Sequence, residues 1–144
     1  METKKVLKYI DHGFGFPVEL CNVTMIKVRG KWTLQVNYNQ LAKRVLVSLA
    51  EFDGRLTGNQ VKFIRQHFEM TLQQFAARLE VTHAAVKKWE NAENEQTGMS
   101  WTTEKDIRLF TKQQSQPKPK EFLYFYNRLE SVPSRRPIKL SLAW

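Results

Sequence analysis

Apolar residues recur at helical spacing along most of the chain and alternate with polar residues in two short stretches. Helical spacing and capping residues predict helices at about residues 38–52, 57–68, 71–79, 82–92 and 102–112. Alternation at residues 24–29 and 32–36 predicts a β-hairpin, with Gly30-Lys31 as a two-residue type II′ turn. Because a hairpin alone is barely stable in water, we expect its apolar face to pack against the helix at residues 38–52. The expected fold class is mainly α, a helical bundle preceded by a small N-terminal β-hairpin plus helix.

Threonines mark where three of these helices begin. Two stand three residues before a glutamine, and a third stands just ahead of the next helix: Thr57 with Gln60, Thr71 with Gln74, and Thr82. The first two pairs have the spacing of a capping box, in which each side chain satisfies a backbone N–H of the other residue. The third threonine can accept a hydrogen bond from the first turn of its helix. Only the tight break Glu80-Val81 then separates the third and fourth predicted helices.

Residues 70–94 have the layout of a helix-turn-helix unit. One stripe of the first helix is apolar and consists of Leu72, Phe75, Ala76 and Leu79, at positions i, i+3, i+4 and i+7. In the second helix Val86 and Trp89 point inward, which leaves an opposite face that is small, neutral or basic and free of acids. That face consists of His83, Ala84, Lys87 and Lys88. A helix enters the major groove only with such a face, so we expect it to read DNA.

Six residues are expected to contact DNA. Three would approach base edges, namely His83, Ala84 and Lys87, and three would meet phosphate, namely Gln73, Thr82 and Lys88. Thr82 and His83 stand at a helix N-terminus, where free backbone N–H groups favour an anion. The plainer interpretation is a small helical bundle with incidental basic residues. The joint spacing of the core positions and the acid-free face argues against it.

The stretch from Leu56 to Lys112 resembles the Xre-type, or lambda-repressor-like, helix-turn-helix family. The matching features are a small residue at the helix contact, a valine in the turn, two core residues and an acid after the tryptophan: Ala76, Val81, Val86, Trp89 and Glu90. With LTGNQVKFIRQHFEMT before the motif and TTEKDIRLF after it, the run is most similar to the DNA-binding half of MqsA-type antitoxins. The resemblance implies the antitoxin of a type II toxin–antitoxin system, which represses its own operon and neutralises a ribonuclease toxin.

The chain departs from this family at three points. Glu80 occupies a turn position usually held by glycine, so a positive φ there would cost roughly 1 kcal/mol. Leu72 replaces the usual phosphate-contacting glutamine, with Gln73 next to it. MqsA-type antitoxins also carry a zinc-binding domain, whereas this chain has no Cys-x-x-Cys pair. Cys21 and His12 are too few for a closed four-ligand site, so we expect no metal and no other cofactor.

Composition divides the chain into three segments. Residues 1–53 would form a dimer-forming or partner-binding module, residues 54–112 the DNA-binding domain, and residues 113–144 a linker and apolar C-terminal extension. The extension has one apolar group at helical spacing and one that alternates as in a strand: Phe122, Leu123, Phe125, Tyr126 and Leu129, then Ile138, Leu140, Leu142 and Trp144. We expect it to pack on the hairpin residues Trp32, Leu34 and Val36 or on a second copy of the chain. The other possibility is a partner-binding tail that orders on contact.

The net charge of +9 favours a polyanionic partner. Basic and acidic residues number 8 and 4 in residues 1–52, 9 and 8 in residues 53–112, and 6 and 2 in residues 113–144. The helix-turn-helix is thus almost neutral, and we expect part of the non-specific phosphate affinity to come from the flanks. The same charge works against long-range attraction to a basic ribonuclease toxin.

The sequence also indicates the cellular compartment of the protein and whether it is an enzyme. A single cysteine cannot form an internal disulfide, and no apolar run approaches the roughly 18 residues of a membrane span. We therefore expect a cytoplasmic protein, nucleoid-associated when bound to DNA and without a membrane partner. The common catalytic motifs are missing, so an enzyme is not expected. The enzymatic alternative is a small basic ribonuclease that uses His12 near Lys8.

These patterns together predict a sequence-specific transcriptional repressor that binds double-stranded DNA. One recognition helix covers too few base pairs to be specific, so we expect a homodimer on a palindromic operator. The resemblance adds a protein toxin as a further partner. The alternative is a stand-alone or phage-type transcriptional regulator whose flanks serve dimerisation.

Overall fold

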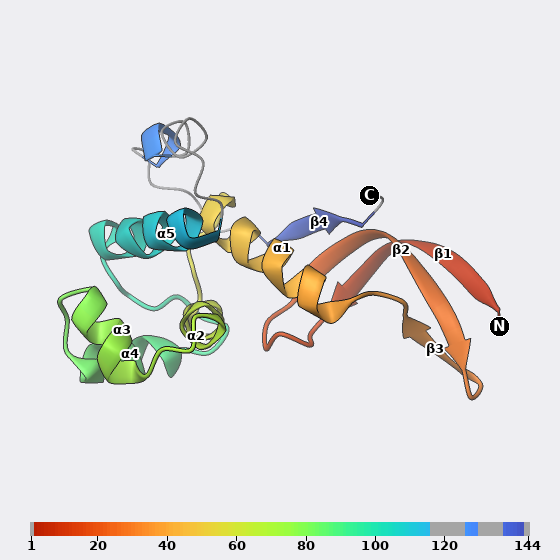
Figure 1. The fold of residues 1–144 in the computed structure, drawn as a ribbon, viewed down its shortest axis with the longest axis horizontal. Helices are drawn as coiled ribbons and strands as arrows, with labels where there is room; N and C mark the ends of the chain where they lie inside the picture. The colour runs from red at the N-terminus through yellow and green to blue at the C-terminus, as the bar shows by residue number, and fades with distance from the viewer. Residues whose placement is uncertain (1, 116–125, 130–136, 143–144) are drawn as a thin grey trace.

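The protein is elongated, with a β-sheet at one end and most of the helices at the other (Figure 1). The computed structural model describes residues 2–115, 126–129 and 137–142. Its elements follow in the order β1 (Thr3–Asp11), β2 (Val18–Val28), β3 (Lys31–Leu34), α1 (Tyr38–Glu51), α2 (Gly58–His67), α3 (Leu72–Arg78), α4 (His83–Glu90), α5 (Trp101–Ser115) and β4 (Lys139–Ser141). Helix α1 runs from the sheet to the other helices and joins the two ends (Figure 1).

The sheet has four strands, in the order β1-β2-β3, with β4 also paired to β2. β1 and β3 run antiparallel to β2, whereas β4 runs parallel to it. β3 pairs with residues 25–28 of β2, and β4 pairs with residues 19–21. The expectation of a mainly α fold is therefore wrong, because a four-stranded mixed sheet makes the chain an α/β protein.

Strand β1 was not predicted from the sequence, because few of its residues are buried and its apolar pattern is weak. It pairs with β2 along one side only and is an edge of the sheet. Most of its side chains are exposed, including Lys4, Lys5 and Lys8. An edge strand with one covered side carries a weak apolar pattern, and lysines there discourage pairing with another strand. The pattern of TKKVLKYID therefore did not distinguish a strand from a loop.

The central strand β2 changes its alternation at Asn22. Val18 and Leu20 are buried before this residue and Val23 and Met25 after it, so the buried positions pass from even to odd numbers. Asn22 has a φ of +58°, a left-handed conformation in which asparagine is enriched. This residue keeps both halves of β2 turned towards the core. It also explains why clean alternation begins only at residue 24.

The expected hairpin is present as β2 and β3, but its turn lies one residue earlier. Val28 pairs with Lys31, which leaves Arg29-Gly30 as the two-residue loop. Their φ values are +52° and +78°. Positive φ at both central residues is the requirement of a type I′ turn, whose twist matches that of the strands. The expected type II′ turn at Gly30-Lys31 is therefore wrong.

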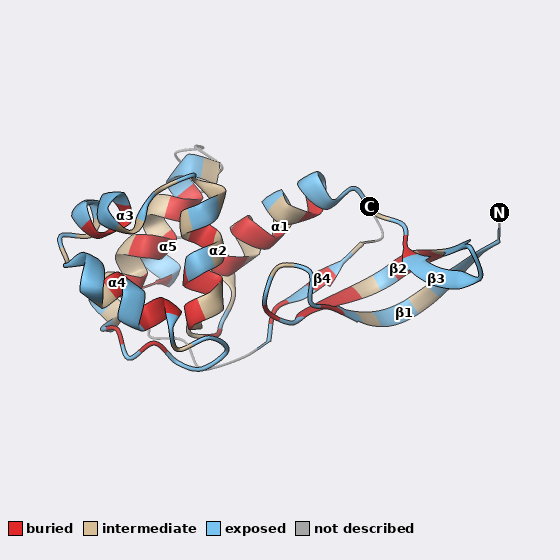
Figure 2. Cartoon of the chain, turned by 90° about the horizontal axis from the view of Figure 1, so that it is seen from below, coloured by how far each residue is buried: buried red, intermediate tan, exposed pale blue. Residues whose placement is uncertain are grey.

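One hydrophobic core runs from the sheet into the helices (Figure 2). Its fully buried members come from nearly every element and include Leu20, Leu41, Ile64, Phe75, Val86, Ile107 and Ile138. In the loop before β2, Phe14 and Phe16 lie edge-on to Phe63 of α2, with ring centroids 5.5 and 5.6 Å away. The core thus continues past residue 53, and the division of the chain into three segments stays a prediction.

A buried ion network fixes α5 to the connection between α1 and α2. Arg108 is fully buried and donates to the Glu104 carboxylate at 2.9 Å and to the carbonyl oxygen of Phe52 at 2.7 Å. A further hydrogen bond joins it to the carbonyl oxygen of Gly54. Glu104 in turn accepts the backbone N–H of Leu56 at 3.2 Å. The network satisfies backbone groups that this connection would otherwise bury unpaired.

The C-terminal extension returns to the N-terminal sheet, as expected, and pairs with a part of β2 that precedes the predicted hairpin residues. Ile138 and Leu140 are buried, and β4 pairs with residues 19–21 of β2. Leu34 belongs to the same hydrophobic core as Ile138 and Leu140, and Val36 and Leu142 pack against that core, whereas Trp32 remains exposed. The expected packing on the hairpin is therefore confirmed for Leu34 and Val36. Leu129 is buried beside Ala50, and Tyr126 is exposed. The remaining apolar residues of the extension, Phe122, Leu123, Phe125 and Trp144, lie outside the described residues.

Candidate nucleic-acid interface

Helices α3 and α4 form the helix-turn-helix, and capping residues set where they begin. Thr71 and Gln74 exchange hydrogen bonds of 2.9 and 3.1 Å as a complete capping box. Thr82 accepts the backbone N–H of Ala85 at 3.1 Å and caps α4. The expected starts of both helices are confirmed. Helix α4 ends at Glu90, two residues earlier than expected, because its last turn loosens into a loop.

The turn between the two helices is closed by a left-handed residue, Glu80, with a φ of +57°. The N–H of Glu80 donates to the carbonyl oxygen of Ala77 at 3.2 Å, and that of Val81 donates to Ala76 at 3.0 Å. These two bonds are the pattern of a Schellman motif, which most often has glycine at the left-handed position. Glu80 thus adopts the conformation that glycine usually provides at this turn position. The side chain there costs roughly 1 kcal/mol relative to glycine.

Close packing against α2 holds α4 at its C-terminal end. Val86 and Trp89 face inward and are buried, as expected. Gly58, at the start of α2, lies so close that a Cβ on it would stand 2.3 Å from the carbonyl oxygen of Trp89. No residue with a side chain fits this approach without moving one helix. The glycine directly after the capping threonine is visible in the sequence, but the helix that it contacts is not, because the two lie about 30 residues apart.

An ion pair with two hydrogen bonds clamps α4 to α2. Arg65 donates from Nε and Nη2 to the two carboxylate oxygens of Glu90, at 2.7 and 2.9 Å. It also donates from Nη1 to the carbonyl oxygen of Met70 at 2.9 Å. The hydrogen bonds to Glu90 raise the pKa of Arg65, so the guanidinium stays charged. The pair both orients α4 and neutralises its one acidic side chain. Arg65 was missed because the pairing joins residues 25 positions apart.

The outer face of α4 carries the residues expected to meet DNA. All six of them are exposed: Gln73, Thr82, His83, Ala84, Lys87 and Lys88. Four share the outer side of α4, Gln73 is on α3, and Thr82 is the helix cap. Figure 2 shows α4 with its exposed side at the surface, at the end of the molecule away from the sheet. The hydroxyl oxygen of Thr82 already accepts the capping bond, so only its O–H can be offered to a phosphate.

The electrostatics of this face suit an anion. Within the described residues, neither Lys87 nor Lys88 has a carboxylate within ion-pair distance. The N-terminus of α4 adds the positive end of a helix dipole beside His83. Arg78 of α3 is engaged with Asp106 of α5 at 3.7 Å, so it contributes less to the field. The arrangement offers two free ammonium groups and a helix N-terminus to a polyanion, with Ala84 leaving room for close approach.

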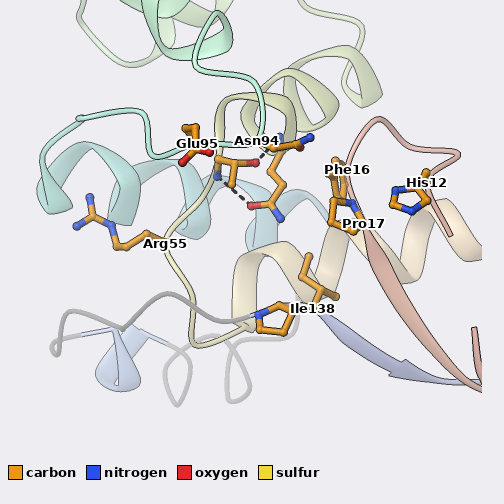
Figure 3. A pocket seen from close by; sticks show the side chains of 10 residues that line it. His12, Phe16, Pro17, Arg55, Asn94, Glu95 and Ile138 are labelled. Carbon is orange, nitrogen blue, oxygen red and sulfur yellow. Dashed lines mark hydrogen bonds between the residues drawn. The ribbon is translucent and has the colours of Figure 1, made fainter. Parts of the chain in front are cut away.

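A pocket of about 620 Å³ lies between the loop before β2, the start of α2 and the residues before β4 (Figure 3). His12 and Arg55 line it from opposite sides (Figure 3). Arg55 is engaged there, since it donates to Glu104 at 2.8 Å and to the carbonyl oxygen of Met99 at 2.9 Å. Lys8 is also engaged, through its ion pair with Glu19 at 3.0 Å. Arg55 and Lys8, two described basic side chains that could accompany His12 in a ribonuclease site, therefore already have carboxylate partners.

Metal-ligating side chains do not gather in the described residues, where no group of three or more occurs. Cys21 is half-buried in β2, and His12 is exposed in the loop between β1 and β2. The expected absence of metal and of other cofactors stays a prediction. Within the same part of the chain, no helix has the length and apolar character needed to cross a membrane.

Comparison with known proteins gives no match to any protein-family model, curated protein or solved structure. Function is therefore inferred from the geometry of the site.

Proposed function

We propose that this protein is a sequence-specific double-stranded DNA-binding protein in which α4 enters the major groove. The observation that carries the proposal is the exposed, acid-free face of α4 on a helix held by the Arg65–Glu90 pair and by the close approach of Gly58. A recognition helix must present short and basic side chains outward while its own position is fixed. Helix α4 meets both requirements.

In this proposal the six expected contact residues divide into base-reading and phosphate-binding groups. His83, Ala84 and Lys87 approach base edges, and the ammonium of Lys87 can donate to the O6 and N7 acceptors of guanine. Gln73, Thr82 and Lys88 contact phosphate and set the register of the helix on the duplex. Charge at these phosphate contacts supplies affinity, and the groove-facing atoms supply selectivity.

We propose that the protein acts as a cytoplasmic transcriptional repressor and binds a palindromic operator as a homodimer. One α4 contacts only a few base pairs, and a two-fold pair of recognition helices doubles the length that is read. The antitoxin role implied by the family resemblance is a narrower proposal within this one. Support for it would be an adjacent reading frame whose product, a small toxin, co-purifies with this protein when both are expressed. A gene that stands alone would favour a stand-alone or phage-type regulator.

Selection of binding sites from random duplexes by the full-length protein tests the proposal. We expect one enriched, two-fold symmetric sequence, bound far more tightly than scrambled DNA. On that sequence Lys87→Ala should weaken binding by about 1–3 kcal/mol and relax preference at one base pair of each half-site. Lys88→Ala should weaken binding to every duplex about equally. It should also reduce the slope of log binding constant against log salt concentration by about one.

Lys43→Ala is the matched control, because Lys43 is an exposed lysine on α1, away from α4. It should leave selectivity unchanged. If no sequence is enriched, or if Lys87→Ala behaves like the Lys43 control, the assignment of α4 as the reading helix is wrong.

A further inference from the structure

A basic projection stands at the end of the sheet farthest from α4 (Figure 1). We define the basic arm as residues 2–5 and 26–33, which comprise the start of β1, the end of β2, the turn and most of β3. It contains five basic residues and one acidic residue: Lys4, Lys5, Lys27, Arg29 and Lys31, with Glu2. The turn that forms its tip is exposed, as are most of its side chains (Figure 2).

Side-chain contacts order part of the arm. The ammonium of Lys4 lies 4.3 Å from the centre of a Trp32 ring, and that of Lys27 lies 5.9 Å away, so two cations from different strands stack on one aromatic side chain. Lys27 also faces Glu2 at 4.0 Å. Trp32 remains 38% exposed, which is uncommon for a tryptophan that merely fills a core.

The other three cations of the arm are available to a partner. Among the described residues, no carboxylate lies within ion-pair distance of Lys5, Arg29 or Lys31. Arg29 sits at a position with a φ of +52°, where asparagine or glycine would be easier to accommodate. The turn itself would favour asparagine or glycine here, whereas the arginine places a charge at the tip of the arm.

The arm is fixed relative to α4 by contacts between the two ends of the molecule. Phe14 and Phe16, from the loop that joins β1 to β2, pack against Phe63 of α2. From the same helix, Asn59 donates to the carbonyl oxygen of Gly15 at 2.9 Å and to the side-chain oxygen of Asn94 at 3.2 Å. Because Asn94 follows α4, this contact links the base of the sheet to the loop after the recognition helix. The arm and α4 project towards the same side of the molecule, the lower edge of Figure 1.

We propose that the basic arm is a second DNA contact, which binds phosphate groups outside the base pairs read by α4. This inference rests on the proposed function. Ammonium and guanidinium groups on a rigid projection neutralise phosphates without reading sequence. Helix α1, with its 14 residues, is about 21 Å long, a length that spans about six base pairs when it lies along a duplex, so the arm would contact phosphates that flank the site of α4. The arm thus supplies affinity that the almost neutral helix-turn-helix lacks.

The test uses two duplexes and a variant of the full-length chain. The short duplex is the shortest one whose binding still depends on Lys87, and the long duplex adds about 10 base pairs at each end. The variant K5Q/R29N/K31Q removes three charges, and its new Asn-Gly pair suits the type I′ turn, so folding is preserved. Equal melting temperatures of the variant and the wild type confirm this. The charge-retaining variant K5R/R29K/K31R is the control.

We expect the wild type to bind the long duplex more tightly than the short one. The neutral variant should lose this gain, by roughly tenfold, and its salt dependence on the long duplex should fall by about two to three units. On the short duplex the neutral variant should bind with the same affinity as the wild type. The charge-retaining variant should match the affinity of the wild type on both duplexes.

Three results would overturn the inference and leave the proposed function standing. Equal affinity of wild type and neutral variant for the long duplex would mean that the arm does not touch DNA. Equal losses of affinity on both duplexes would mean that the substitutions act through the fold or on the site that α4 binds. Capture of an acidic protein partner by the arm, with long-duplex affinity unchanged, would assign the arm to that partner instead. Failure of the wild type to bind any duplex would refute the proposed function itself, and the arm's role in DNA binding with it.

Discussion

At the scale of single residues, several non-glycine residues have a left-handed backbone conformation that glycine would adopt at a lower cost in free energy. Glu80 closes the helix-turn-helix turn with a φ of +57°, and Glu69 closes the end of α2 in the same way with a φ of +56°. At both places the N–H groups of the glutamate and of the next residue complete a Schellman pattern. The backbone hydrogen bonds, which do not depend on the side chain, hold these residues in place.

Glycine at position 80 should therefore stabilise the protein. Glu80→Gly should raise the free energy of unfolding by up to about 1 kcal/mol, less the extra entropy that glycine brings to the unfolded chain. Denaturant unfolding of the variant and the wild type measures the difference. Glu80→Ala is the control, because it removes the carboxylate and keeps the strain. If both variants change stability equally, the charge of the glutamate matters and its φ does not.

At the scale of elements, a single carboxylate joins three strands of the sheet. Glu19 of β2 accepts from Lys8 of β1 at 3.0 Å and faces Lys139 of β4 at 3.4 Å. The hydrogen bond from Lys8, together with the nearby charge of Lys139, holds the pKa of Glu19 below its ordinary value, against a smaller opposing effect of desolvation. β4 has only three residues, so this ion pair adds to the strand pairing and the buried apolar side chains that attach it.

The attachment should therefore weaken in acid. A carboxyl group whose pKa is lowered by folding stabilises the fold above its unfolded pKa, and this contribution disappears as the pH falls through the folded value. The unfolded value is 4.5. We expect Glu19→Gln to melt at a lower temperature than the wild type at pH 7, and the gap to close as the pH falls below about 4.5.

Paired melting curves of Glu19→Gln and wild type between pH 7 and pH 3 measure this gap. Glu69→Gln is the control, since Glu69 is exposed at the end of α2, on a different part of the molecule. A gap that stays constant with pH would show that the substitution acts through packing rather than through the charge of Glu19.

At the scale of the whole molecule, the last strand completes a core that begins near the first one. Ile138 is 1% exposed and belongs to the same core as residues of β2, α1 and α2. Closing the chain in this way joins residues more than a hundred positions apart, as the pairing of Glu19 with Lys139 shows. Residues 137–142 are thus part of the fold of a single chain, and Ile138 needs no second copy to cover it.

Removing that contact should cost a large share of the stability. Ile138→Ala should lower the free energy of unfolding by about 2–4 kcal/mol, because it deletes buried methyl groups and leaves a cavity. Leu7→Ala is the matched control: Leu7 is 82% exposed on β1 and its loss should change stability by less than about 0.5 kcal/mol. Chemical denaturation of both variants measures the difference. Equal, small effects would mean that the extension is not seated on the core in solution.

Local signals in the sequence determined the helix-turn-helix. The capping boxes, the apolar stripe of α3, the inward Val86 and Trp89, and the exposure of Lys87 and Lys88 depend on residues within about two helical turns of one another. The same is true of the hairpin strands and of the positive φ at Glu80. The face of α4 that is proposed to read DNA was therefore predictable from spacing alone.

Only the tertiary structure decided the rest, because the deciding contacts join distant residues. β1 is a strand because β2 lies beside it, since its own sequence is mostly exposed and basic. β4 pairs with β2 across more than a hundred residues, and Arg65 finds Glu90 on another helix. Periodicity reports which side of an element is covered, and only the folded chain shows what covers it. For this reason the sequence predicted a helical bundle with a hairpin, whereas the structure is an α/β protein with a basic arm.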